Sequence, residues 1–134
     1  MNTQLIFFDS YANSLQGTMR GLIAFISLIV FDYIWFSFTK NKYHVTKNPI
    51  NIYAALVVWL FICSALAVQR PKSYYEALVY SLLVGFVIYG VFNFTNFAIL
   101  KEWKFEIVIM DTLWGAFNCA IAGSLIYLLY WKNK

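Results

Sequence analysis

Charged residues are scarce in this sequence, where Asp, Glu, Lys and Arg make up 12% of 134 residues. A soluble domain of this length needs more charge to cover its surface, so that class is excluded. Histidine occurs once and cysteine twice, without paired metal-ligand spacing. Glycine occurs six times and forms neither a phosphate-binding loop nor a linker. We therefore expect no catalytic residue, no metal, no cofactor and no second domain.

Apolar residues dominate instead, at 62% of the chain with 21% aromatic and a mean hydropathy of +0.66. About 20 apolar helical residues cross a bilayer, so the length allows about four spans. We predict an all-α protein, a transmembrane four-helix bundle with short loops and an N-terminal interfacial arm. The arm is expected over 1–16 and the membrane domain over 17–134, with spans at about 21–38, 50–68, 76–100 and 107–130.

Local signals place the ends of these spans. Asn48 followed by Pro49 predicts the start of the second span, with Asn as the cap and Pro at the first helical position. Ser73 and Glu76 have the spacing of a capping box and predict the start of the third. The arm lacks the basic start and cleavage site of a signal peptide.

The net charge of +4 comes from basic residues in short loops, where they suit lipid headgroups and not nucleic acid. The loop after the first span is expected to face headgroups. With four spans, five basic residues fall on each side of the membrane, so orientation stays open. Both cysteines fall in apolar runs and are expected to be small buried hydrophobes. The headgroup-facing residues are Lys40, Lys42, His44 and Lys47.

Polar side chains inside the spans are costly and should have partners. Asp32 lies about 9 Å and Asp111 about 6 Å from the same side of the membrane at 1.5 Å rise per residue. Asn93 and Asn96 lie about 10 and 6 Å from that side. The expected intramembrane polar cluster therefore draws on three helices. Its members are Asp32, Asn93, Thr95, Asn96, Asp111 and Asn118.

Small and polar residues form stripes along the third and fourth spans, where they let helices approach closely. The unit Asp-x-x-Trp occurs twice, at Asp32 with Trp35 and at Asp111 with Trp114. An indole N–H so placed could help to satisfy a carboxylate on a neighbouring helix. The stripes are Ser81, Gly85, Tyr89, Asn93 and Asn96, then Asp111, Gly115, Asn118 or Cys119, and Ala122 or Gly123. The supporting aromatics are Trp35, Tyr89, Trp103 and Trp114.

These motifs resemble a domain-of-unknown-function family of small membrane proteins, found in bacteria and in large DNA viruses. The family pattern reads Tyr-Gly-x-Tyr-Asp-x-Thr-Asn, a later Trp, then Asp-x-x-Trp-Gly. This chain has Phe92 and Asn93 where many relatives have Tyr-Asp, which removes a carboxylate. The resemblance implies an architecture and no activity. The matching residues are Tyr89, Gly90, Phe92, Asn93, Thr95, Asn96, Ala98, Leu100, Trp103, Asp111, Trp114 and Gly115, with Asp32, Trp35, Tyr43, Arg70 and Pro71.

Three functions remain open. The favoured one is a membrane-anchoring, membrane-organising or assembly protein, whose partners are the bilayer and other membrane or capsid proteins, or further copies of itself. The Lys- and Asn-rich composition fits the viral branch of the resemblance and points to a virion's inner membrane or a capsid–membrane contact. The alternative is proton, cation or solute transport by Asp32 and Asp111 in an oligomer. An intramembrane lipid-acting enzyme is the third, and we expect the chain not to be an enzyme.

Overall fold

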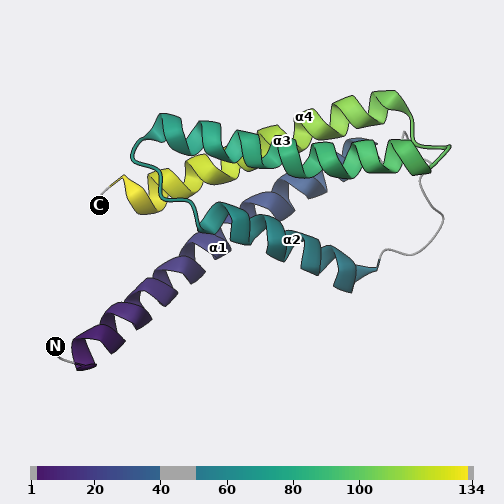
Figure 1. Ribbon diagram of the computed structural model, residues 1–134. Coiled ribbons are helices and arrows are strands. Elements are labelled where there is room, and N and C mark those ends of the chain that lie inside the picture. Colours follow the sequence, from purple (N-terminus) through teal and green to yellow (C-terminus); the bar gives the residue numbers. More distant parts are fainter. Residues whose placement is uncertain (1–2, 40–50, 133–134) are drawn as a thin grey trace.

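A computed structural model describes residues 3–39 and 51–132, with side chains from Ser14 onward. Four α-helices follow one another, and a π-helical turn extends the last of them (Figure 1). The described residues contain no strand, so the all-α prediction is confirmed. The basic loop with Lys40, Lys42, His44 and Lys47 lies outside the described residues. The elements are α1 Thr3–Thr39, α2 Ile52–Ala67, α3 Tyr74–Ile99, α4 Phe105–Ile126 and the turn η1 Tyr127–Trp131.

Helix α1 is continuous from Thr3 and contains the expected boundary between arm and membrane domain. No proline interrupts it, and a glycine such as Gly17 inside a helix costs only about 1 kcal/mol. At 37 residues it is about 55 Å long. Its N-terminal part extends well beyond the end of the bundle (Figure 1).

Helix α2 begins three residues later than the Asn48-Pro49 signal predicts. Asn51 is the cap, and its side-chain oxygen accepts a hydrogen bond from the Ala54 N–H at 3.2 Å. Asn48 and Pro49 themselves lie outside the described residues. An Asn side chain caps equally well at either position, and the sequence does not say which Asn is used.

The capping box at the start of α3 is present, with one partner shifted. The Glu76 N–H donates to Ser73 Oγ at 3.1 Å, whereas the Lys72 N–H donates to Glu76 Oε2 at 2.8 Å. The carboxylate thus bonds the amide one residue before the cap. Both bonds satisfy amides at a helix start, which is why α3 begins at Tyr74.

Within the described residues, three helices are long and apolar enough to cross a membrane, over Ser14–Thr39, Tyr74–Ile99 and Phe105–Trp131. Helix α2 is apolar but has 16 residues, slightly fewer than the shortest spans of about 17. Exposed Leu, Ile, Val and Phe side chains cover the outside of the bundle. Such a surface suits acyl chains and not water.

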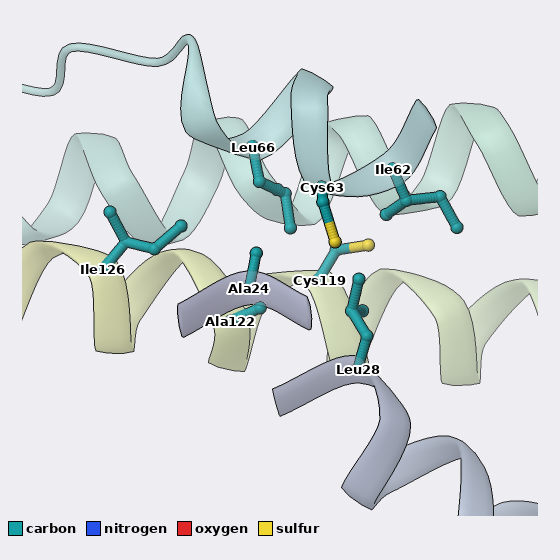
Figure 2. Close-up of a cluster of buried hydrophobic side chains, with 8 residues drawn as sticks. All are labelled: Ala24, Leu28, Ile62, Cys63, Leu66, Cys119, Ala122 and Ile126. Atoms are coloured by element: carbon teal, nitrogen blue, oxygen red, sulfur yellow. The ribbon is translucent and has the colours of Figure 1, made fainter. Parts of the chain in front are cut away.

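Helices α3 and α4 form an antiparallel hairpin, and α1 and α2 pack against it (Figure 1). The apolar core lies where α1, α2 and α4 meet, and the side chains of Cys63 and Cys119 approach each other there (Figure 2). Both thiols are free and buried, as expected. The core residues are Ala24, Leu28, Ile62, Cys63, Leu66, Cys119, Ala122 and Ile126.

Candidate functional site: a polar cluster inside the bundle

Asp111 on α4 is bonded by side chains from two other helices. The Trp35 indole N–H of α1 donates to Asp111 Oδ1 at 3.1 Å, and Asn93 Nδ2 of α3 donates to Oδ2 at 2.8 Å. One carboxylate therefore ties α1 and α3 to α4. Hydrogen bonds to a charged acceptor are stronger than those between neutral groups.

Asp32 on α1 is bonded in the same way by different helices. The Trp59 indole N–H of α2 donates to Asp32 Oδ2, and Asn118 Nδ2 of α4 donates to Oδ1, both at 2.9 Å. Asp32 is 8% exposed and Asn118 is fully buried. Each carboxylate thus receives one indole N–H and one amide N–H, all from neighbouring helices.

Asn93 connects the cluster to the turn between α3 and α4. Its Nδ2 also donates to the Tyr89 carbonyl at 2.9 Å, and its Oδ1 accepts from the Trp103 indole N–H at 3.3 Å. Asn93 is completely buried. A side-chain amide can donate and accept at once, whereas an ionised carboxylate at this position could not donate to Asp111. An asparagine at position 93 therefore suits the neighbouring acid.

The two carboxylates lie toward the same end of the bundle but not at one level. Asp32 of α1 is hydrogen-bonded to Asn118 of α4, whereas Asp111 of α4 is hydrogen-bonded to Trp35, which lies further along α1. Asp111 and Asn118 are seven residues apart, about 10 Å along α4. Each acid has its own donors, so the cluster consists of two adjacent sites and not one shared pair.

The remaining predicted members divide into two groups. Trp114 stacks on Trp35 with ring centroids 4.8 Å apart and planes 11° apart, but its indole N–H has no partner among the described residues. Thr95 is exposed and Asn96 is half-buried, so the cluster takes in Asn93 but not these two neighbours. A helix turns 100° per residue, so side chains two and three positions on need not share a polar contact.

Two functional positions were not identified from the sequence, Trp59 and Arg20. Trp59 is the only tryptophan of α2 and lies near its middle, away from the interfacial positions where Trp is common. A tryptophan at this unusual depth indicates a partner for its N–H, so the sequence did carry a signal for Trp59. Arg20 looked like a residue at the edge of a span.

Arg20 forms a second polar contact toward the other end of the bundle. It is 7% exposed, and its Nε donates to the carbonyl of Ala67, the last residue of α2, at 2.8 Å. Its guanidinium carbon lies 5.0 and 5.2 Å from the ring centroids of Tyr130 and Trp131. The cation thus joins α1 to the end of α2 and to η1 through a helix-end carbonyl and two aromatic faces.

The described part of the chain forms no ion pair with Asp32 or Asp111: all four donors are neutral. The same part contains no group of three or more His, Cys, Asp or Glu side chains that could hold a metal. The arrangement can therefore hold helices together, or exchange a proton or cation at an acid that has no fixed counter-charge.

The apolar helices and the buried polar cluster define a multi-pass integral membrane protein. Residues 18–128 match the family described as "Predicted membrane protein (DUF2177)", and the chain belongs to this family. The resemblance inferred from the motifs is thus confirmed. No curated protein and no solved structure matches the chain.

Proposed function

We propose that this protein anchors or organises a membrane as a rigid bundle with a structural polar interior. The observation that carries this proposal is the pairing of both intramembrane acids. Each of the four carboxylate oxygens of Asp32 and Asp111 accepts a hydrogen bond from a side chain on a neighbouring helix. Interhelical hydrogen bonds in membranes contribute about 0.6 kcal/mol each on average, up to about 1.7.

The location of the surface hollows supports the same role. A hollow of about 670 Å³ lies between α3 and α4, and one of about 480 Å³ lies between α1 and α2. Neither is lined by Asp32 or Asp111, and both have mainly apolar linings. Acyl chains fill such grooves, whereas a substrate path would have to reach the acids.

We propose the bilayer and other membrane or capsid proteins, or further copies of the chain, as partners. A virion's inner membrane is the setting we infer from the Lys- and Asn-rich composition. The test is cross-linking of the tagged protein in its native membrane, followed by identification of its neighbours, together with deletion of its gene. Specific protein neighbours and an altered membrane or particle are expected. A monomer without protein contacts, whose loss changes neither, would contradict the proposal.

Transport of protons or cations is the second candidate, because neither acid is neutralised by a cationic side chain among the described residues. The test is ion flux into liposomes containing the wild type or the double variant Asp32→Asn, Asp111→Asn. The variant keeps the side-chain volume and removes both charges. Flux that is present in the wild type and lost in the variant would favour transport over anchoring. Wild-type flux equal to that of empty liposomes would remove this candidate.

A further inference from the structure

Arg20 is a buried cation whose charge has no opposite charge beside it in the described part of the chain. Its side chain is 7% exposed, and its Nε donates to the Ala67 carbonyl. A guanidinium has five N–H groups, and the other four have no acceptor among the described residues. The rings of Tyr130 and Trp131 stabilise the cation but supply no counter-charge. Buried charges are normally paired, so an anion is expected here.

Two more N–H groups near Arg20 lack an acceptor. Trp131 Nε1 and Gln69 Nε2 are both buried without a partner among the described residues. Trp131 is one of the two rings over the guanidinium, and Gln69 follows two residues after Ala67. Buried donors without an acceptor are rare and costly. All of these unpaired groups are donors, so they suit a ligand rich in acceptor oxygens, such as a phosphate.

The hollow between α1 and α2 borders the Arg20 guanidinium. Gly17 and Ala67 both line this hollow. The Ala67 carbonyl accepts the bond from Arg20, and Arg20 Nη2 is the atom nearest to a Cβ added at Gly17, at 3.9 Å. A Cβ added at Gly21, which also lines the hollow, would meet nothing within 4 Å. Glycine costs stability inside a helix, and here it leaves space that no other helix fills, next to the unpaired cation.

The position of Arg20 along the bundle is that of lipid headgroups. It lies beside the last residue of α2 and beside η1, and the end of α2 and the C-terminal end of the chain lie at the same end of the bundle (Figure 1). Three exposed basic residues follow these elements, Arg70, Lys72 and Lys132. Among the described side chains this end has one acid, Glu76, whose carboxylate bonds the Lys72 N–H. This end of the bundle therefore attracts anions.

We propose that the groove between α1 and α2 binds one anionic phospholipid, whose phosphate accepts hydrogen bonds from the Arg20 guanidinium. The planar guanidinium matches two phosphate oxygens at once. One acyl chain lies along Leu22, Phe25 and Leu60, which line the same groove. Leu60 is seven residues before Ala67, about 10 Å deeper in the membrane. This apolar lining favours a lipid over free phosphate, and the site does not depend on the anchoring role.

Native mass spectrometry of the full chain in detergent micelles tests this site. The protein is titrated with phosphatidylglycerol, with phosphatidylcholine of the same acyl chains, and with glycerol 3-phosphate. Arg20→Met removes the guanidinium, and Arg70→Met is its control because Arg70 is an exposed cation at the same end. Gly21→Leu fills the groove at a position where a Cβ meets no other atom. Ile26→Phe is its control, because Ile26 is 62% exposed on α1 and does not line the groove.

We expect one tightly bound phosphatidylglycerol per wild-type chain. Its affinity should exceed that of phosphatidylcholine at least about fivefold, since each nearby cation adds attraction for a net negative headgroup. Glycerol 3-phosphate should not bind at the same concentrations. Arg20→Met and Gly21→Leu should each weaken phosphatidylglycerol binding about tenfold or more, because one loses charge-assisted hydrogen bonds and the other loses the acyl-chain contact. The two controls should change it less than about twofold.

Several outcomes would overturn this site. Equal affinities for the two lipids, or equal losses in Arg20→Met and Arg70→Met, would mean general surface attraction. Glycerol 3-phosphate bound as tightly as the lipid would assign Arg20 to a free phosphate. Unchanged binding in Gly21→Leu would remove the groove, and this variant decides the question if circular dichroism shows that Arg20→Met is not folded. These measurements use purified protein, so their failure leaves the anchoring proposal unaffected.

Discussion

The pair α3 and α4 is joined through the backbone, whereas α1 is joined to the bundle through side chains. Gly85 of α3 lies so close to α4 that a Cβ there would be 2.5 Å from the Gly115 carbonyl oxygen and 2.8 Å from Ala116 Cα. Neither glycine of α1 lies in such an approach: a Cβ at Gly17 would have only the Arg20 side chain nearby, at 3.9 Å, and one at Gly21 would meet nothing within 4 Å. Its specific contacts are the polar ones of Arg20, Asp32 and Trp35.

This difference shows two ways in which the position of a helix relative to its neighbours is specified inside a membrane. Apolar packing alone discriminates poorly between helix neighbours and lipid, because acyl chains are as apolar as Leu. The hairpin achieves specificity by a close fit that leaves no room for an added atom at Gly85. Helix α1 achieves it by directional bonds near both ends of the core, and each bond can be removed singly. A single substitution at the contact between α3 and α4 should therefore cause a large loss of stability, whereas each substitution at a polar contact of α1 should cause a smaller one.

The largest effect is expected for Gly85→Ala. Its new Cβ meets backbone atoms that cannot rotate away, so the helices must separate, at a cost of about 3 kcal/mol or more. Far-UV circular dichroism during denaturation in detergent micelles measures the shift. Gly90→Ala is the control on the same helix, because its nearest contact is Thr112 Cγ2 at 3.6 Å. Gly90→Ala should leave stability unchanged or raise it slightly. Equal losses of stability in both variants would contradict a specific close backbone contact between α3 and α4 at Gly85.

A smaller loss is expected for Asp111→Leu. This variant leaves the Trp35 and Asn93 donors without their acceptor, at about 1–3 kcal/mol for each buried orphan. Relaxation of the cluster should limit the total to about 2–3 kcal/mol. The same denaturation experiment measures it. Asp111→Asn keeps the volume and one acceptor oxygen and should lose about half as much. If Asp111→Leu were neutral, the acid would not hold α1 to the hairpin.

Arg20→Met tests the other end of α1 and should cost about 1–2 kcal/mol. Met keeps an apolar stem but removes the bond to the Ala67 carbonyl and the contact with Tyr130 and Trp131. The loss of stability is limited because the variant also removes the free-energy cost of burying a cation. Arg70→Met is the control, since Arg70 is exposed and should shift the denaturation midpoint little. Equal shifts in the two variants would argue against a specific role for the Arg20 contact.

Much of the fold was predictable because its signals are local or periodic. Apolar runs marked the helices, and Ser73 with Glu76 marked the start of α3. The stripe from Ser81 to Asn93 correctly predicted the face that meets α4, where Cβ atoms added at Gly115 and Gly123 would collide with Tyr89 and Ser81. Such signals survive in a sequence because helix geometry alone converts spacing into a face.

The rest of the site depends on contacts between distant residues, which spacing does not encode. Depth counting placed Asp32 and Asp111 together, but it could not show that each acid has separate donors. It also could not find Trp59 or Arg20, whose partners lie on other helices. The polar residues of α1 indicate which of its faces turns inward, but they do not show which residues of the other helices that face will meet.

The smallest expected effect separates hydrogen bonding from stacking within one aromatic pair. Trp35→Phe removes the N–H that bonds Asp111 but keeps a ring against Trp114, so it should cost about 0.6–1.7 kcal/mol. Trp114→Phe removes an N–H that has no partner among the described residues and loses a similar amount of ring area. The difference between the two denaturation midpoints therefore measures the bond from Trp35 to Asp111. If Trp114→Phe cost as much as Trp35→Phe, stacking and not the indole–carboxylate bond would attach this part of α1 to the hairpin.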